Sequence, residues 1–189
     1  MKNFKTIGTI SAILVIINYF GIALSEFLLS ETWLVTLMDE VIFRLIFTFS
    51  LVGFYFALTQ YLNQYGFKAI SRLINILILV EVVAFIFRIA QYYSDPLPGL
   101  ILTIIYLSVI ILFIAIGIKI LNIKNDQMLN LQQLKLFVKV MFVTFGVIFI
   151  MAILLTTNNR IEFMNSVYSI YAIPYIFGLI FFIKLDNEN

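Results

Sequence analysis

Six long apolar stretches follow one another along this chain, and they constrain its fold more than any other feature. They cover residues 6–29, 41–59, 70–92, 100–122, 134–156 and 168–184, with short polar segments between them. An α-helix needs roughly 20 mostly apolar residues to cross the hydrocarbon core of a bilayer, and each stretch is near that length. The sequence therefore predicts an all-α, polytopic membrane protein: a bundle of about six transmembrane helices with short loops.

The composition indicates that lipid is the second solvent of this protein. The chain is 63% hydrophobic and 12% charged, whereas soluble domains are about 45–50% apolar and about 25% charged. A soluble protein of 189 residues lacks the interior volume to bury so many apolar side chains. The longest polar segment, 124–133, is too short to fold alone. We therefore expect a single integral membrane domain over residues 1–189, with no soluble domain.

The beginning of the chain has some features of a signal peptide. Residues 1–5 carry two lysines before an apolar stretch, and 23–25 resembles a cleavage site of small residues. The apolar stretch is longer than the apolar region of a typical signal peptide. We therefore expect a retained first span.

The distribution of basic residues predicts the orientation. In a six-span arrangement, one side of the membrane receives nine of the twelve Lys and Arg residues: Lys2, Lys5, Lys68, Arg72, Lys119, Lys124, Lys135, Lys139 and Lys184. The other side receives Arg44, Arg88 and Arg160. Cytoplasmic loops carry the excess of Lys and Arg in membrane proteins. We therefore expect a protein of the plasma (inner) membrane with both termini in the cytoplasm.

The residue types that are missing exclude several kinds of chemistry. The chain has no cysteine and no histidine, so it lacks disulfides, thiolate nucleophiles, the commonest general base and the commonest zinc ligand. Its net charge of +2 is too small to indicate nucleic-acid binding. We therefore expect no metal, no cofactor and no enzymatic activity.

One segment resembles a catalytic motif. The residues Asp39-Glu40-Val41-Ile42-Phe43-Arg44 resemble the Glu-Glu-x-x-x-Arg motif of the CAAX-protease and bacteriocin-processing family. That resemblance implies an intramembrane hydrolase in which the motif works with histidines on later helices. This chain has aspartate at the first position and no histidine, so the family's catalytic constellation is incomplete here.

Ionisable residues within the apolar stretches form the candidate functional site. Glu81 lies near the middle of the third stretch, and Arg88 follows it by seven residues on the same helical face. Glu40 and Arg44 are four residues apart at the start of the second stretch, and Glu26 lies near the outer end of the first. A charged side chain at bilayer depth costs about 2.5–3.5 kcal/mol on insertion scales and commonly marks a functional site. We predict that these five residues form a polar cluster in the outer half of the bundle.

A purely structural interpretation of the same residues stays open. Glu81 and Arg44 would then hold two neighbouring helices together as an ion pair, and Arg88 would extend its side chain toward the membrane surface. Ion pairs of this kind need have no function.

Three tyrosines recur near the outer end of the sixth stretch. Tyr168, Tyr171 and Tyr175 lie at i, i+3 and i+7, on one face of a helix. An aromatic belt at the membrane surface accounts for them without function. The alternative is an aromatic vestibule above the charged cluster.

Two lysines mark the inner end of the fifth stretch. Lys135 and Lys139 share a helical face at the inner membrane boundary. They are topology determinants in the first place, and they are candidates for contacts with anionic lipid or a cytoplasmic partner.

Two functions from different classes fit this sequence. The first is a non-enzymatic transporter- or channel-type subunit that binds or passes a small solute or ion through its helix bundle, as a homo-oligomer or with a partner subunit. The alternative is a small polytopic effector or regulator of a soluble stress or phage-defence system, which acts by membrane association or pore formation. The sequence identifies neither the solute nor the partner.

Overall fold

The computed structural model describes residues 3–28, 41–93, 99–124, 128, 130–157, 167 and 169–187. These residues form six α-helices and one short 3₁₀ helix, with no β-strand among them. The helices are α1 (Asn3–Leu28), α3 (Val41–Gln64), α4 (Lys68–Tyr93), α5 (Gly99–Leu121), α6 (Leu131–Thr157) and α8 (Ala172–Asn187), and the 3₁₀ helix η2 is Ser169–Tyr171. The predicted all-helical architecture is confirmed for the described part of the chain.

Five of the six helices have the length and hydropathy of membrane spans, as expected for the first five apolar stretches. The sixth apolar segment, Ser169–Leu185, is shorter than the other five. Its α-helical part starts at Ala172, so that Pro174 lies in the first helical turn. Proline is tolerated there because the first amides of a helix have no intrahelical acceptor in any case.

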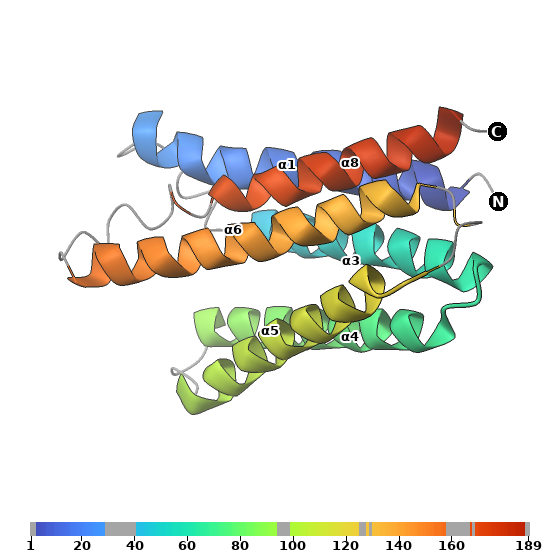
Figure 1. The fold of residues 1–189 in the computed structure, drawn as a ribbon. Coiled ribbons are helices and arrows are strands. Elements are labelled where there is room, and N and C mark those ends of the chain that lie inside the picture. Colours follow the sequence, from blue (N-terminus) through green and yellow to red (C-terminus); the bar gives the residue numbers. More distant parts are fainter. Residues whose placement is uncertain are drawn as a thin grey trace.

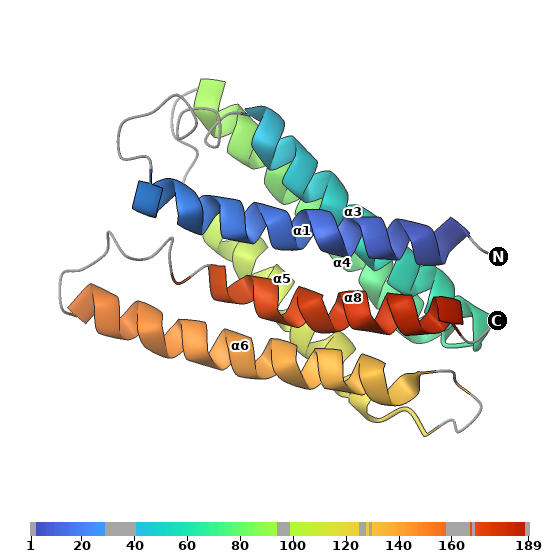
Figure 2. The same cartoon turned by 90° about the horizontal axis from the view of Figure 1, so that it is seen from above.

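The six α-helices form a closed bundle in which each helix runs antiparallel to the one before it (Figure 1). Within the described residues, the backbone of each helix comes close to those of only two others, in the order α1, α3, α4, α5, α6, α8 and back to α1. Figure 2 shows α1, α8 and α6 lying side by side. Helices α1 and α8 close the bundle, and the ammonium group of Lys5 donates a hydrogen bond of 2.5 Å to the carbonyl of Leu185.

The connection between α3 and α4 explains why these two helices are neighbours. The amide of Phe67 donates to the carbonyl of Leu62, and the amide of Gly66 donates to that of Asn63. This pair of bonds is the Schellman pattern that ends a helix, and it requires a left-handed residue at the position of Gly66, where φ is +80°. The chain therefore reverses within a few residues, and α4 packs back along α3.

The bundle interior is filled by aromatic side chains, mainly from α3 and α8. The ring of Phe54 is buried and lies 5.2–5.7 Å, between ring centroids, from Tyr55, Phe137, Tyr175 and Phe182. Gly178 on α8 makes room for this ring, since a Cβ built there would lie 2.7 Å from it. The centre of the bundle is therefore closely packed around the Phe54 ring.

Apolar side chains also cover the outside of the bundle. Phe49, Leu79, Val143 and Phe149 are each 63–68% exposed, and they belong to three different helices. A helix that is apolar on all sides suits either a protein core or a membrane.

Candidate functional site

Four of the five charged residues of the predicted cluster lie in described helices: one in α1, one in α3 and two in α4. Glu26 lies in α1 and Arg88 in α4, although the side chains of both are outside the described part of the structure, as is the whole of Glu40. Arg44 is exposed on α3, and Glu81 is half-buried on α4. Because α3 and α4 pack against each other, the helices that carry Arg44 and Glu81 are neighbours. The complete five-residue cluster stays a prediction.

A pair of tyrosines lies in the interior of the bundle. Tyr55 on α3 and Tyr175 on α8 are both 3% exposed, and their hydroxyl groups share a hydrogen bond of 2.9 Å. A tyrosine hydroxyl buried among apolar side chains needs such a partner, since leaving it unpaired costs about 1–3 kcal/mol. The bond therefore joins two helices that are not neighbours in the bundle.

Glu81 belongs to the surroundings of this tyrosine pair. Glu81 lies within electrostatic range of the hydroxyl groups of Tyr55 and Tyr175. Along α4, Glu81 follows Leu77 by four residues, and residues four apart lie on the same helical face. Leu77 is buried in the bundle core. Glu81 is therefore on the side of α4 that faces the bundle interior.

Further aromatic rings lie around the tyrosine pair, on the side where the η2 helix is found. The ring of Tyr19 is 6.0 Å from that of Tyr175 and 5.7 Å from that of Tyr171, between centroids. Tyr171 in turn lies 5.4 Å from Phe145, and Phe145 lies 5.5 Å from Phe113. Helices α1, α5, α6 and the η2 turn thus all contribute rings to one cluster.

The packing around the tyrosine pair can be compared with the aromatic-belt interpretation of the three tyrosines in the sixth apolar stretch. Tyr175 is buried, and Tyr171 is partly buried against rings of α1 and α6. Tyr168 lies outside the described residues. The interpretation as an aromatic belt does not describe Tyr175, because a belt residue has its hydroxyl at the membrane surface.

Sequence reasoning missed Tyr55, Tyr19 and the aromatic residues around them. The signal that could have found Tyr55 is its place near the middle of an apolar span, where a hydroxyl group must find an acceptor or donor. The sequence contains no indication of which residue that partner is. The partner is 120 positions away in the chain.

A small cavity lies beside the pair, between α3, α4, α5 and α6. Its volume is about 30 Å³, which is room for a very few water molecules. The hydroxyl-bearing Tyr55 is its one polar side chain, and all other lining residues are apolar: Leu58, Ile74, Leu77, Phe113, Ile116, Gly117, Ile120, Phe137, Val138, Met141 and Phe142.

The two lysines at the start of α6 differ in their surroundings. The ammonium group of Lys135 donates a hydrogen bond of 2.6 Å to the carbonyl of Ile123, just after the end of α5. Lys139 is exposed. Both line a shallow surface depression of about 380 Å³ together with Gln132, Gln133 and Leu136. This surface offers hydrogen-bond donors to an anionic group, although nothing in the structure identifies one.

Two other polar atoms in the interior have no hydrogen-bond partner among the described residues: Oδ1 of Asn18 and Oγ1 of Thr59. The amide nitrogen of Asn18 donates to the carbonyl of Leu14, 2.7 Å away on the same helix. Asn18 therefore makes no polar contact with another helix in the part of the chain that the structure describes.

Among the described residues, no three acidic side chains come close enough to hold a metal ion. Comparisons of this chain with protein-family models, with curated proteins and with solved structures give no match. Its function has to be inferred from the arrangement described above.

Proposed function

We propose that this chain is an integral membrane protein whose six helices cross the bilayer and whose interior binds, or passes, a small solute or ion. The observation that carries the proposal is the buried Tyr55–Tyr175 pair, together with Glu81 on the inward side of α4, in a largely apolar bundle.

The surface and the helix lengths support membrane insertion. Five helices have the length and hydropathy of a membrane span. On several of them, phenylalanine or leucine side chains are more than 60% exposed. The sixth segment is also long enough to cross a bilayer. Its 16 α-helical residues and three 3₁₀ residues extend about 30 Å, which is the thickness of the hydrocarbon core.

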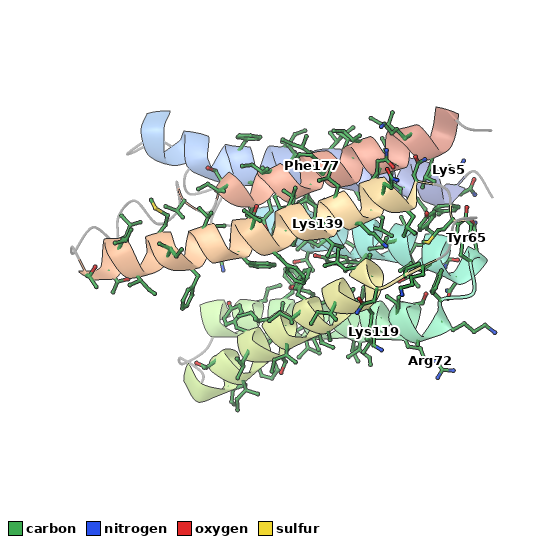
Figure 3. All side chains as sticks on the ribbon, viewed as in Figure 1. Lys5, Tyr65, Arg72, Lys119, Lys139 and Phe177 are labelled. Carbon is green, nitrogen blue, oxygen red and sulfur yellow. The ribbon has the colours of Figure 1, made fainter. Side chains whose placement is uncertain are left out.

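The charges support the predicted orientation. The antiparallel order of the helices brings the beginning of α1, α4 and α6 and the end of α3, α5 and α8 to one end of the bundle. Figure 3 shows Lys5, Arg72 and Lys119 toward this end, whereas Arg44 belongs to the start of α3 at the other. An excess of basic residues favours the cytoplasmic side, so we place both termini there.

The depth of the polar group supports a role in binding. Glu81 lies about 20 Å along α4 and Tyr55 about 21 Å along α3, at about 1.5 Å per residue. Both are therefore near the middle of helices of 26 and 24 residues. An acidic side chain at that depth is costly, so its presence favours a functional role over an incidental one.

We further propose that the protein is not an enzyme and that it works as an oligomer or with a partner subunit. The chain lacks histidine, so the histidine-dependent constellation of the family that Asp39–Arg44 resembles cannot be completed. Catalytic turnover by the purified protein that is lost in Glu40→Gln would contradict this part of the proposal.

The proposal is tested by screening for solutes that stabilise the purified protein. A ligand that binds only the folded state at 100 times its Kd stabilises it by about 2.7 kcal/mol, which thermal unfolding in detergent resolves. We expect at least one ion or small solute to stabilise the wild type and Lys139→Gln but not Glu81→Gln. Lys139 is the matched control because it is a charged, exposed residue outside the bundle interior.

The alternative, in which Glu81 only pairs with arginine for packing, gives a different pattern. Glu81→Gln would then lower stability in the absence of any solute, and the apolar triple replacement Arg44→Met, Arg88→Met and Glu81→Leu would restore it. That pattern, with no solute whose binding depends on Glu81, would overturn the proposed function.

A further inference from the structure

One side of α6 is exposed along most of the helix. Its exposed positions are three or four residues apart, the spacing of a single helical face: Gln132, Leu136, Lys139, Val143, Val147 and Ile150. The buried side chains of α6, among them Leu134, Met141 and Ile148, lie on the opposite side. We call the exposed side the α6 outer face.

Most of the α6 outer face is apolar and open. Val143 is 66% exposed and Ile150 is 59% exposed. Gly146 lies in the same face, and a Cβ built there would meet no atom within 4 Å. Apolar side chains that no part of the described chain covers are solvated by hydrocarbon in a bilayer. An acyl chain can therefore lie along this part of α6.

Lys139 brings a positive charge into this apolar face (Figure 3). It follows Leu131, the first residue of α6, by eight positions, which is about 12 Å along the axis. A helix of 27 residues is about 40 Å long, so a core of about 30 Å centred on it begins about 5 Å from its end. Lys139 then lies about 7 Å inside the hydrocarbon, and its ammonium group has to extend toward the phosphates of the membrane surface.

A shallow depression lies where this ammonium group would meet the headgroups. It has a volume of about 380 Å³ and is lined by Gln132, Gln133, Lys135, Leu136 and Lys139. Four of these five side chains can donate hydrogen bonds, and two of them are positively charged. Lys135 already donates to the carbonyl of Ile123, and its ammonium group has further N–H groups to offer. The depression is therefore suited to an anionic acceptor such as a phosphodiester.

The surrounding charges also favour an anion. Residues 119–139 contain four lysines and one acidic residue, Asp126. Helices α5 and α6 contain no acidic residue, and α8, the other neighbour of α6, carries Asp186 near its end. The side chains of both aspartates lie outside the described part of the structure. The beginning of α6 adds the positive end of a helix dipole, which attracts negative charge.

The depression alone does not identify the anion, but its continuity with the apolar face does. A soluble anion would use only the polar end of this surface, whereas a phospholipid matches both parts. We propose that the α6 outer face binds an anionic phospholipid, with its phosphate at Lys139 and Gln132 and an acyl chain along Val143, Gly146 and Val147. Anionic lipids are concentrated in the cytoplasmic leaflet, where the proposed topology places the beginning of α6.

This inference rests on the proposed membrane insertion and is independent of solute binding in the bundle interior. The lipid surface is on the outside of α6. Lys139→Gln therefore still serves as the control for a solute bound inside the bundle.

The assignment is tested by photolabelling in nanodiscs of phosphatidylcholine. Trace probes of phosphatidylglycerol and phosphatidylcholine carry the same diazirine-bearing acyl chain, and the labelled residues are mapped by mass spectrometry. We expect the phosphatidylglycerol probe to label residues 143–150 about fivefold more than the phosphatidylcholine probe, because a basic residue near the membrane surface contributes about 1 kcal/mol of attraction. Lys139→Gln should remove most of this preference, and Lys139→Arg should keep it.

The matched control is Lys68→Gln. It makes the same change of charge at an exposed position at the same end of the bundle, on a helix that is not a neighbour of α6. The preference for phosphatidylglycerol should survive this substitution. A preference that Lys139→Gln leaves intact, or that Lys68→Gln reduces equally, would overturn the site.

Two further outcomes separate lipid from a soluble anion and this inference from the proposed function. Inorganic phosphate should leave the preference unchanged relative to chloride at equal ionic strength, and its loss in phosphate would indicate a site for a soluble anion. Equal labelling of α6 by both probes would refute the anionic-lipid site and leave membrane insertion standing. Labelling of α6 by neither probe would refute insertion, and the proposed function would fail with it.

Discussion

The hydrogen bond between Tyr55 and Tyr175 can be measured as a coupling free energy. Phenylalanine at either position keeps the ring and removes the hydroxyl group. Each single substitution leaves the other hydroxyl buried without its partner, since both side chains are 3% exposed and bond to each other over 2.9 Å. We therefore expect each single variant to lose about 1–3 kcal/mol of the free energy of unfolding.

The double variant should lose less than the two single variants together. With both hydroxyl groups absent, no buried polar atom is left unpaired, so the second substitution costs little or even restores stability. Interhelical hydrogen bonds in membrane proteins average about 0.6 kcal/mol and reach about 1.7 kcal/mol in double-mutant cycles. We expect a coupling toward the upper end of this range, because the bond is buried and the two tyrosine rings pack against Phe54 and Phe137.

The assay is unfolding in mixed micelles by increasing proportions of sodium dodecyl sulfate, followed by circular dichroism. The four proteins of the cycle are compared under the same conditions. Additive losses, within about 0.3 kcal/mol, would show that the two hydroxyl groups do not interact. That result would refute both the bond and the position of α8 across from α3.

Three further predictions test other parts of the structure. Gly178→Ala should destabilise the protein by about 1–3 kcal/mol, because its Cβ would meet the ring of Phe54 at 2.7 Å. Gly146 has open space around it, so Gly146→Ala should be neutral or stabilise the protein by up to about 1 kcal/mol. Equal effects of the two substitutions in thermal unfolding would contradict the packing of Phe54 against Gly178. Asn18→Leu should leave stability unchanged or raise it, since Oδ1 of Asn18 is buried without a partner, and a loss of more than about 1 kcal/mol would indicate a polar contact that the structure does not contain. Single cysteines at Asp95 and Asn125 should differ in labelling by an impermeant maleimide on intact cells, because the basic residues predict that only position 95 is external; labelling of Asn125 alone would reverse the proposed topology.

The number of helices and most of their limits follow from the sequence alone. Apolar stretches long enough to cross a bilayer are separated by short polar segments, and the predicted 70–92 and 100–122 differ from α4 and α5 by at most two residues at either end. Hydropathy alone does not give the end of the second helix. The apolar stretch ends at residue 59, but α3 continues to Gln64, because backbone hydrogen bonds continue through polar residues until Gly66 reverses the chain.

Which side of each helix faces inward was decided only by the tertiary structure. In a soluble protein, an apolar stripe on a polar helix identifies the buried face, but these helices are apolar on every side, and lipid solvates an apolar side chain as well as a protein interior does. The buried face is then selected by close packing, as where Gly178 accepts the ring of Phe54 and Gly117 that of Phe142. The sequence alone shows that an acidic residue, Glu81, lies near the middle of the third apolar stretch. The tyrosine pair beside it required Tyr55 and Tyr175 to be brought together by the closure of the bundle, which depends on the fit of residues far apart in the chain.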